Sequence, residues 1–325
     1  MSRWRFLVVL SCALVVGVAT WSFTEDPDPT KGTRGPAAPL AVPYTTISSA
    51  GPLTDIFLGA EASAQVAHQL DTTYYEVYPP STIPGDYGTF VVVADVLYAP
   101  DFANHDGTAS GNIGTYTAFS MVSQSAVMGS GTSGDPYRVT TVYDVGTTGL
   151  QLTQVDSYVV GQELFQTDIQ MANTGSSPVD AILYRAFDCY LGGSDSGYGL
   201  QSGTSVGCSE NPNNTPPGRI EQLVPITGGN NYYEAGYSQV WAAIGTHMPF
   251  NDTCRCGENI DNGAGISWSV TVPAGGATDI SHQTVFSPTG VVAGEPIPTL
   301  SGWGFAVFIG LMAFLGVGVF FWQRR

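Results

Sequence analysis

Apolar and polar residues alternate along much of the middle of the chain, with the period of two that half-buried β-strands show. In residues 163–173, one face carries apolar or small side chains and the other carries Gln166 and Gln170. Turn-forming residues at 173–178 lead into a second run at 179–188. Two such runs around a short turn predict a β-hairpin.

The same pattern recurs near the end of the body. Residues 265–273 alternate, residues 273–276 are turn formers, and residues 279–286 form the next run, which predicts a second hairpin. Earlier in the chain, residues 89–98 are almost continuously β-branched or aromatic, as in one well-buried strand. Helical periodicity is nearly absent between these segments.

These segments predict an all-β fold. About ten strands punctuated by turns indicate a large antiparallel β-sandwich, which we place at residues 44–286. A repeat of about 20 to 50 residues, which a solenoid or propeller would show, is not visible. The body is therefore expected to be one large β unit or two smaller ones.

The N-terminal end has the pattern of a secretory signal peptide. Residues 1–5 are basic and residues 6–18 are almost continuously apolar, so we assign residues 1–22 to a signal peptide. An uncleaved N-terminal anchor is the alternative, because the apolar stretch reaches Phe23. Residues 23–43 contain five prolines and predict an extended linker.

The C-terminal end predicts a membrane-spanning helix after a spacer at residues 287–296. Residues 305–322 contain no charged side chain, and their length at about 1.5 Å per residue nearly matches a hydrocarbon core of about 30 Å. The basic pair Arg324 and Arg325 should stay cytoplasmic by the positive-inside rule. The body would then lie on the other side of the membrane.

A short motif precedes this helix, formed by Ile297, Pro298, Thr299, Leu300, Trp303 and Gly304. These residues fill all six fixed positions of the bacterial IPTL-type C-terminal sorting signal, a relative of the signals handled by exosortases, so residues 297–325 resemble that signal. Gly302 departs from the family, where an acidic residue is common. The resemblance implies cleavage near residues 298–300 by a membrane-embedded exosortase and delivery of the body to the envelope. A permanent anchor is the alternative.

Residues 137–286, including the stretches 183–190 and 261–268, are similar to a module of exported bacterial proteins without an assigned activity. This resemblance supplies no catalytic residues. The sorting signal and this module together imply a destination for the protein and leave the role of its body open.

The charge of the body excludes some partners. The chain of 325 residues has 27 acidic and 10 basic residues, and four of the basic ones belong to the two ends. The processed body would carry a formal charge of −21. It has too few basic residues to form a patch that neutralises phosphates, so nucleic acid and anionic lipid are not expected as ligands.

Four cysteines remain in the body, and an even number in an exported chain predicts two disulfides. A bond between Cys254 and Cys256 would close a very tight ring. We therefore expect the loop between Cys189 and Cys208 to be linked to the Cys254–Cys256 turn by one of the two long-range pairings. A four-thiolate metal site is the alternative, but these spacings lack the usual Cys-x2-Cys pairs.

Two loops carry weak calcium candidates, because Ca²⁺ prefers hard oxygen ligands from loops. Phe102 stands where an EF-hand-like run would need its first aspartate, and Asp and Asn are also the commonest turn residues. We therefore expect no bound cofactor. The candidates are Asp101, Asn104, Asp106 and Asn112 in one loop and Asp188, Asp195 and Glu210 around the other.

The sequence contains no recognised catalytic constellation. The histidines are scattered, and the nucleophile elbow and the phosphate-binding loop are absent. His282 is expected to be a hydrogen-bonded core histidine. A glycosidase needs two converging carboxylates, and among 27 acidic residues some pair would always qualify. The carboxylates that we considered are Asp188, Asp195, Glu221 and Glu234.

A group of aromatic residues offers a binding role without catalysis, because exposed rings stack on sugars. The group consists of Tyr232, Tyr233, Tyr237 and Trp241. Core packing is the favoured interpretation of these residues.

We expect an exported protein that passes through the inner membrane to the cell envelope or surface. Its body would have a structural or adhesive role, and its partner would be an exosortase-like processing enzyme. The alternative is a carbohydrate-binding or carbohydrate-active protein whose partner is extracellular polysaccharide.

Overall fold

The computed structural model describes residues 43–70, 75–102, 105, 110–215 and 218–287. The predicted signal peptide, nearly all of the linker, the spacer beyond its first residue, the sorting motif and the C-terminal helix lie outside these residues. None of the helices in the described ranges has the length and apolar character needed to cross a bilayer.

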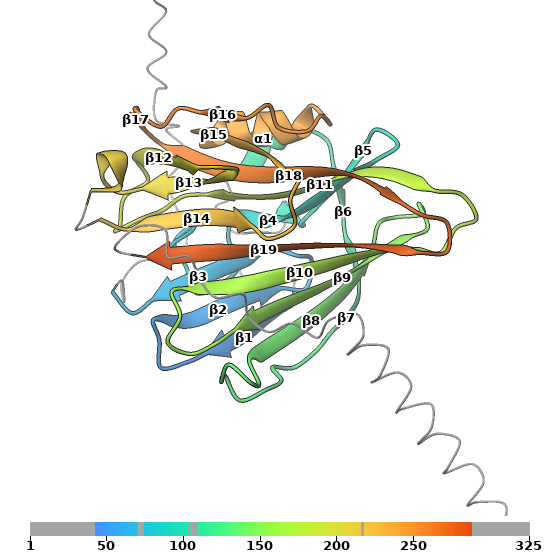
Figure 1. Ribbon diagram of the computed structural model, residues 1–325, viewed down its shortest axis with the longest axis horizontal. Coiled ribbons are helices and arrows are strands. Elements are labelled where there is room, and N and C mark those ends of the chain that lie inside the picture. Colours follow the sequence, from blue (N-terminus) through green and yellow to red (C-terminus); the bar gives the residue numbers. More distant parts are fainter. Residues whose placement is uncertain (1–42, 71–74, 103–104, 106–109, 216–217, 288–325) are drawn as a thin grey trace, which may run out of the picture.

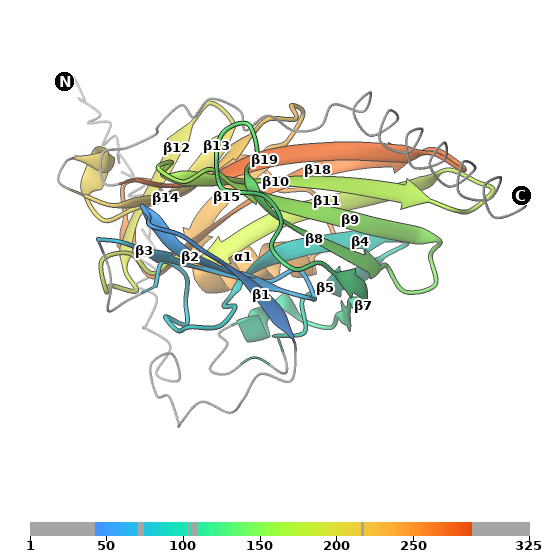
Figure 2. The same cartoon turned by 90° about the horizontal axis from the view of Figure 1, so that it is seen from below.

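Three sheets account for most of the fold, and the two larger ones form an antiparallel β-sandwich (Figures 1 and 2). The largest has the strand order β17 (Asn259–Ile260), β12 (Gly197–Ser202), β13 (Ser205–Ser209), β14 (Ile220–Pro225), β19 (Ala277–Ser287), β10 (Leu164–Asn173), β9 (Leu150–Tyr158), β8 (Tyr137–Asp144) and β7 (Ser120–Gln124).

The second sheet has seven strands and faces the first. Its order is β16 (Thr253–Cys254), β15 (Asn231–Gly236), β18 (Asn262–Val272), β11 (Val179–Asp188), β4 (Tyr87–Val93), β5 (Val96–Ala99) and β6 (Thr117–Ala118). The pairs β15–β16 and β5–β6 are parallel, and the other pairs are antiparallel. A small third sheet consists of β1 (Tyr44–Ser48), β2 (Leu53–Gly59) and β3 (Ala64–His68).

The predicted alternation places the expected side chains in the core. On β10, the face that carries Phe165, Ile169 and Met171 is buried, whereas Gln170 is exposed. These residues join one continuous apolar cluster that also includes Leu183 and residues of the small third sheet. The all-β prediction is therefore confirmed for the described part of the chain.

Both predicted hairpins are wrong. Strand β10 pairs with β9 and β19, whereas β11 pairs with β4 and β18, so residues 174–178 carry the chain from one sheet to the other. Residues 273–276 do the same between β18 and β19. We call these two connections the first and second arch. Alternation specifies which face of a strand is buried, but it does not specify the strand's neighbours.

The single strand predicted at residues 89–98 is a hairpin of β4 and β5. The turn residues Ala94 and Asp95 have φ angles of 49° and 62°, and Val91 pairs with Tyr98 across the hairpin. Tight hairpin turns need positive φ at both central positions, which Asn-Gly usually supplies. An Ala-Asp turn inside a β-branched run gave no sequence signal.

One helix in the described body was not predicted. Helix α1 (Tyr237–Gly245) packs against β15 and β18 and is shown beside them in Figure 1. Its buried residues are Tyr237, Val240, Trp241 and Ile244, at the spacing of one helical face. Nine residues are too few for this period to stand out in the sequence. Two short 3-10 turns, Ser110–Ile113 and Pro212–Asn214, complete the elements.

A fully buried arginine links the two large sheets. Arg185 on β11 lies 4.0 Å from the centre of the Tyr87 ring and donates a 2.9 Å hydrogen bond to the Thr89 hydroxyl. The Thr89 hydroxyl in turn donates to Gln154 on β9 of the opposite sheet, at 2.8 Å. Asp156 lies near enough to interact electrostatically with Arg185. The sandwich therefore contains a polar layer within its apolar core.

The two arches are held together by the side chain of Asn173, the last residue of β10. Its Nδ2 donates to the carbonyl oxygen of Ser177 at 2.9 Å and to that of Val272 at 3.1 Å. Its Oδ1 accepts from the backbone N–H of Gly175 at 2.8 Å. Since Asn173 is almost completely buried, water cannot replace these bonds.

We expect Asn173→Ala to lower the free energy of unfolding by about 2–4 kcal/mol, because three buried hydrogen bonds are lost and two carbonyl groups lose their donor. Denaturant unfolding measures the change. Gln170→Ala on the same strand is the control, because Gln170 is exposed and its side-chain amide donates to the exposed Asp279, and it should cost no more than about 0.5 kcal/mol. Equal losses in both variants would contradict the assigned role of Asn173.

Candidate functional site

The end of the sandwich opposite the arches gathers the chemically distinctive residues. Strand β11 runs from the first arch to Asp188, and β18 begins at Asn262 and runs to the second arch, so Asp188 and Asn262 mark this end. Both disulfides lie here. We call it the disulfide end and define it by Cys189, Cys208 and the segment 253–262.

The first disulfide joins the two large sheets. Cys189 directly follows β11 of the seven-stranded sheet, and Cys208 lies in β13 of the nine-stranded sheet. Their Cα atoms are 6.4 Å apart and both side chains are buried. The bond therefore crosses the core at the end where the chain also passes from β11 to β12 of the opposite sheet.

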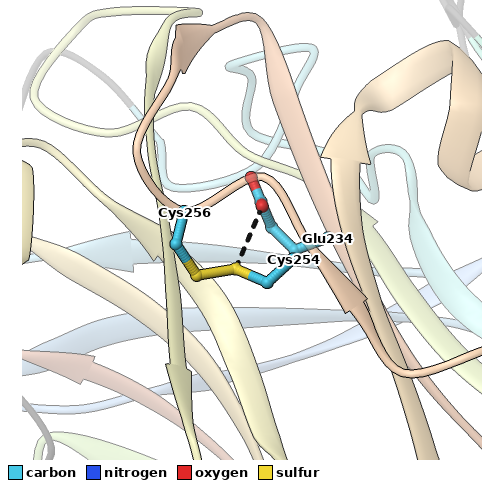
Figure 3. A group of neighbouring side chains, drawn as sticks. All are labelled: Glu234, Cys254 and Cys256. Carbon is cyan, nitrogen blue, oxygen red and sulfur yellow. Dashed lines mark hydrogen bonds between the residues drawn. A yellow bond between two sulfur atoms is a disulfide. The ribbon is translucent and has the colours of Figure 1, made fainter.

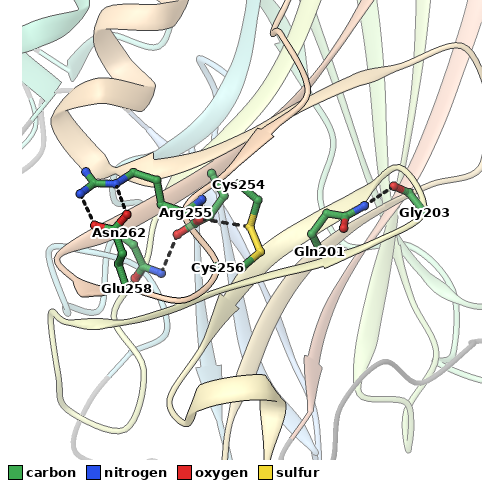
Figure 4. Close-up of a disulfide and its surroundings, with 8 residues drawn as sticks. Gln201, Gly203, Cys254, Arg255, Cys256, Glu258 and Asn262 are labelled. Atoms are coloured by element: carbon green, nitrogen blue, oxygen red, sulfur yellow. Dashed lines mark hydrogen bonds and ion pairs between the residues drawn. A yellow bond between two sulfur atoms is a disulfide. The ribbon is translucent and has the colours of Figure 1, made fainter. Parts of the chain in front are cut away.

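The second disulfide links Cys254 and Cys256 across Arg255 (Figure 4), with Cα atoms 5.2 Å apart. The expected long-range pairing is therefore wrong. The packing of β13 on β11 brings Cys189 next to Cys208, and the Cα separation of the second pair lies in the ordinary range for a disulfide despite the short ring. Because these sulfurs are paired, they do not form a four-thiolate metal site.

Glu234 on β15 lies against the second disulfide (Figure 3). Its Oε2 accepts from the backbone N–H of Arg255 at 2.8 Å and lies 3.3 Å from the Sγ of Cys254. Its Oε1 accepts from the side-chain amide of Asn262 at 3.2 Å. Burial raises the pKa of Glu234 to about 7, although these hydrogen bonds act in the opposite direction.

The Arg255 side chain turns away from the disulfide. Its Nε donates to Glu258 Oε1 at 3.1 Å, and its Nη1 donates to Gln239 Oε1 at 3.0 Å. Glu258 is exposed, and its pKa is lowered mainly by the hydrogen bond from Arg255. The loop that carries the second disulfide is therefore tied to Glu234 on one side and, through Gln239, to α1 on the other.

The raised pKa of Glu234 predicts a pH-dependent stability. The protonated carboxyl is favoured in the folded state, so its contribution is complete below the ordinary pKa of 4.5 and is lost as the pH rises through about 7. Glu234→Gln should remove this loss, so the stability of the variant should improve relative to the wild type between these pH values. Chemical unfolding at a series of pH values measures the difference.

Glu258→Gln is the matched control, because Glu258 lies in the same loop but is exposed and has a lowered pKa. It should leave the profile between pH 4.5 and 7 unchanged. A difference between Glu234→Gln and wild type that does not vary with pH would contradict the raised pKa.

The predicted aromatic group does not form an open platform. Tyr237 and Trp241 lie on α1 and are buried, and Trp241 packs against the rings of Phe90 and Phe102. This pair is therefore unavailable for stacking on a sugar, as the core-packing interpretation expects. Tyr232 and Tyr233 on β15 are half-buried. Tyr233 also stacks on Phe250, with 5.7 Å between ring centroids.

Trp241→Ala should cost about 3–5 kcal/mol of stability, because it leaves a large cavity beneath α1. Tyr232→Ala is the comparison within the same aromatic group and should cost about 1–2 kcal/mol, because part of its side chain already faces solvent. Thermal and denaturant unfolding measure both changes. A Trp241→Ala variant as stable as the wild type would indicate an exposed indole ring.

The four histidines occupy separate places. Three of them face a carboxylate from a distant part of the chain. His282 is fully buried, as predicted, but within the described structure neither ring nitrogen has a hydrogen-bond partner, so the hydrogen-bonded form is not found. Burial, and then Arg185, lower its pKa well below the usual value. The three pairs are His68–Glu163 at 2.7 Å, His105–Glu61 at 2.8 Å and His247–Asp95 at 2.7 Å.

One of these pairs includes a serine, but its order differs from a hydrolytic triad. The hydroxyl of Ser63 donates to Glu61 Oε1, the same atom that meets the Nε2 of His105. In a triad the imidazole lies between serine and carboxylate and takes the serine proton. Here the carboxylate is in the middle, so His105 is not placed as the base for Ser63.

The structure brings together only part of the carboxylates considered from the sequence. Carboxylate oxygens of Asp188, Asp195 and Asp261 all lie within 4.8 Å of one another, and Asp261 was not anticipated. Burial raises the pKa of Glu221 well above its usual value, and the nearby Glu76 and Asp188 raise it further. Glu234 instead binds Asn262 and Arg255, as described above.

The calcium candidates are similarly divided. Glu210 accepts a hydrogen bond from the backbone N–H of Arg219 at 3.0 Å and is not a member of the three-aspartate group. In the other loop, Asp101 is half-buried and Asn112 is exposed. Asn104 and Asp106 lie outside the described residues, so that loop remains a prediction.

No protein family matches the sequence, and no curated protein matches it. Solved structures show a distant likeness. An α-galactosidase from Geobacillus stearothermophilus is 10% identical, with 76% of this chain and 41% of that chain covered and a TM-score of 0.41. A putative aldose 1-epimerase from Escherichia coli is 10% identical, with 76% and 99% covered and a TM-score of 0.34.

A putative kojibiose phosphorylase from the human microbiome is 11% identical, with 72% of this chain and 30% of that chain covered and a TM-score of 0.36. The present chain thus spans less than half the length of the galactosidase and the phosphorylase. TM-scores this low carry no argument about function. The function must therefore be inferred from the residues of this chain.

Proposed function

We propose that this chain is an exported protein of the cell envelope whose β-sandwich body has a structural or adhesive, non-catalytic role. The bond between Cys189 and Cys208 is the observation that carries the proposal. It is buried between the two sheets, and it pairs residues that the fold brings together. Disulfides of this kind persist in oxidising compartments outside the cytoplasm.

The two ends of the sequence support the same destination. A signal peptide at residues 1–22 would start export, and the helix at residues 305–322 would hold the chain in the inner membrane. The motif from Ile297 to Gly304 would then direct an exosortase-like enzyme to cut between the body and the helix. The released body would reach the envelope without its membrane anchor.

A structural or adhesive role is favoured over carbohydrate binding by the placement of the aromatic group. Two of its four rings are buried in the core beneath α1, and a third stacks on Phe250. The body also carries a high negative charge, which keeps it soluble and suits an acidic cell surface. Its rigidity would come from two large sheets that are joined at both ends.

Mass spectrometry of the protein recovered from the cell surface tests the proposal. We expect a C-terminus near residues 298–300 and four body cysteines that react with alkylating reagent only after reduction. Pro298→Ala should impair processing and leave full-length protein in the inner membrane. Pro296→Ala is the matched control, because Pro296 lies directly before the motif.

An intact Arg325 on surface-recovered protein would refute processing, although export could still occur. Cysteines of the body that are alkylated without reduction would refute export to an oxidising compartment. Binding of the purified body to polysaccharide would support the carbohydrate alternative in place of the structural role.

A further inference from the structure

A compact group of acidic residues lies at the disulfide end. Asp188 is the last residue of β11, Asp195 lies in the loop between β11 and β12, and Asp261 directly precedes β18. One carboxylate oxygen from each lies within 4.8 Å of the other two. Asp188 is fully buried, and the other two are half-buried, so the group has an inner side and an open side.

Backbone hydrogen bonds fix the segments that carry these carboxylates. The N–H of Asp188 donates to the carbonyl of Asp86 at 2.9 Å, and the carbonyl of Asp261 accepts from the N–H of Tyr237 at 3.0 Å. Leu191 and Ser194 exchange two backbone bonds of 3.0 Å, which turn the loop back before Asp195. The first disulfide anchors Cys189, next to Asp188. The three aspartates are therefore held in place by the fold.

Next to the three aspartates, Glu221 is a second and independent observation that points to a bound cation. It lies on β14 opposite Cys208 of the adjacent strand and is fully buried. Neither of its carboxylate oxygens has a hydrogen-bond partner among the residues that the structure describes. The carboxylates of Glu76 and Asp188 are close enough to repel it. A buried carboxylate in this position needs a proton or a cation.

The basic residue that acts on Glu221 is also engaged with another carboxylate. Arg219 acts electrostatically on Glu221, and its guanidinium is paired with the buried Glu76. The carboxylates of Glu76 and Asp188 both lie close to that of Glu221, and Asp188 also belongs to the three-aspartate group. Like charges at such short distances are mutually unfavourable unless a counterion lies between them.

We propose that Asp188, Asp195 and Asp261 bind a calcium ion, with Glu221 on its buried side. Carboxylate oxygens from loops are the ligands that Ca²⁺ prefers, and its flexible coordination accepts water on the open side of the group. Mg²⁺ is less suited, because it requires near-ideal octahedral geometry and gives up its water reluctantly. This site does not depend on the proposed cellular role of the protein.

A calcium ion here would join β11, the β11–β12 loop and the start of β18. It would act beside the Cys189–Cys208 bond, at the end of the sandwich that lies opposite the two arches. The expected consequence is a calcium-dependent stability of the exported body. Extracellular modules typically bind Ca²⁺ with dissociation constants of about 10⁻⁴–10⁻³ M.

The test uses the purified full-length chain at neutral pH, with calcium chloride at about 5 mM compared with EDTA. We expect calorimetry to detect binding and the melting temperature to rise by about 3 °C or more with calcium. Magnesium at the same concentration should have a much smaller effect. Asp195→Asn and Asp261→Asn should each weaken calcium binding at least about tenfold, because each removes a charged ligand.

Asp135→Asn is the matched control, since Asp135 is exposed and precedes β8 near the opposite edge of the nine-stranded sheet, and its calcium affinity should stay within about twofold of wild type. Absence of calcium binding by the wild-type chain would overturn the proposal, whether or not the variants fold. Undiminished binding by a folded Asp195→Asn variant would also overturn it.

Discussion

The two sheets of this sandwich are fastened to each other at both ends of the same strands, and the rest of the structure depends on this constraint. At one end the two arches carry the chain from β10 to β11 and from β18 to β19, and Asn173 bonds across both of them. At the other end the Cys189–Cys208 bond connects the sheets. The apolar core between them is therefore closed at both ends.

This closure explains where the unusual side chains lie. The polar layer around Arg185 lies inside the sandwich, where its partners come from both sheets and water is excluded. The carboxylates gather at the disulfide end, where β11 finishes and β18 starts and where a covalent bond already holds the segments. A bound cation would reinforce the end of the sandwich that lies opposite the two arches.

The candidate site could be foreseen only in part. Four cysteines in a chain predicted to be exported indicated two disulfides, but ring size alone favoured the wrong pairing, because the approach of β13 to β11 is not visible in the sequence. Asp188 and Asp195 were candidates, whereas Asp261 was not, since it stands 66 residues further along the chain from Asp195. Helix α1 was missed because its apolar face is only two turns long.

The sequence by itself determined the class of fold, the buried face of strands such as β10 and the presence of disulfides, because these follow from local periodicity and composition. It also supports the predicted destination through residues at its two ends. Only the tertiary structure decided which strands are neighbours, which cysteines pair and which carboxylates meet. Those outcomes depend on contacts between distant segments, and the energy of such contacts is set by packing between sheets, which no local pattern encodes.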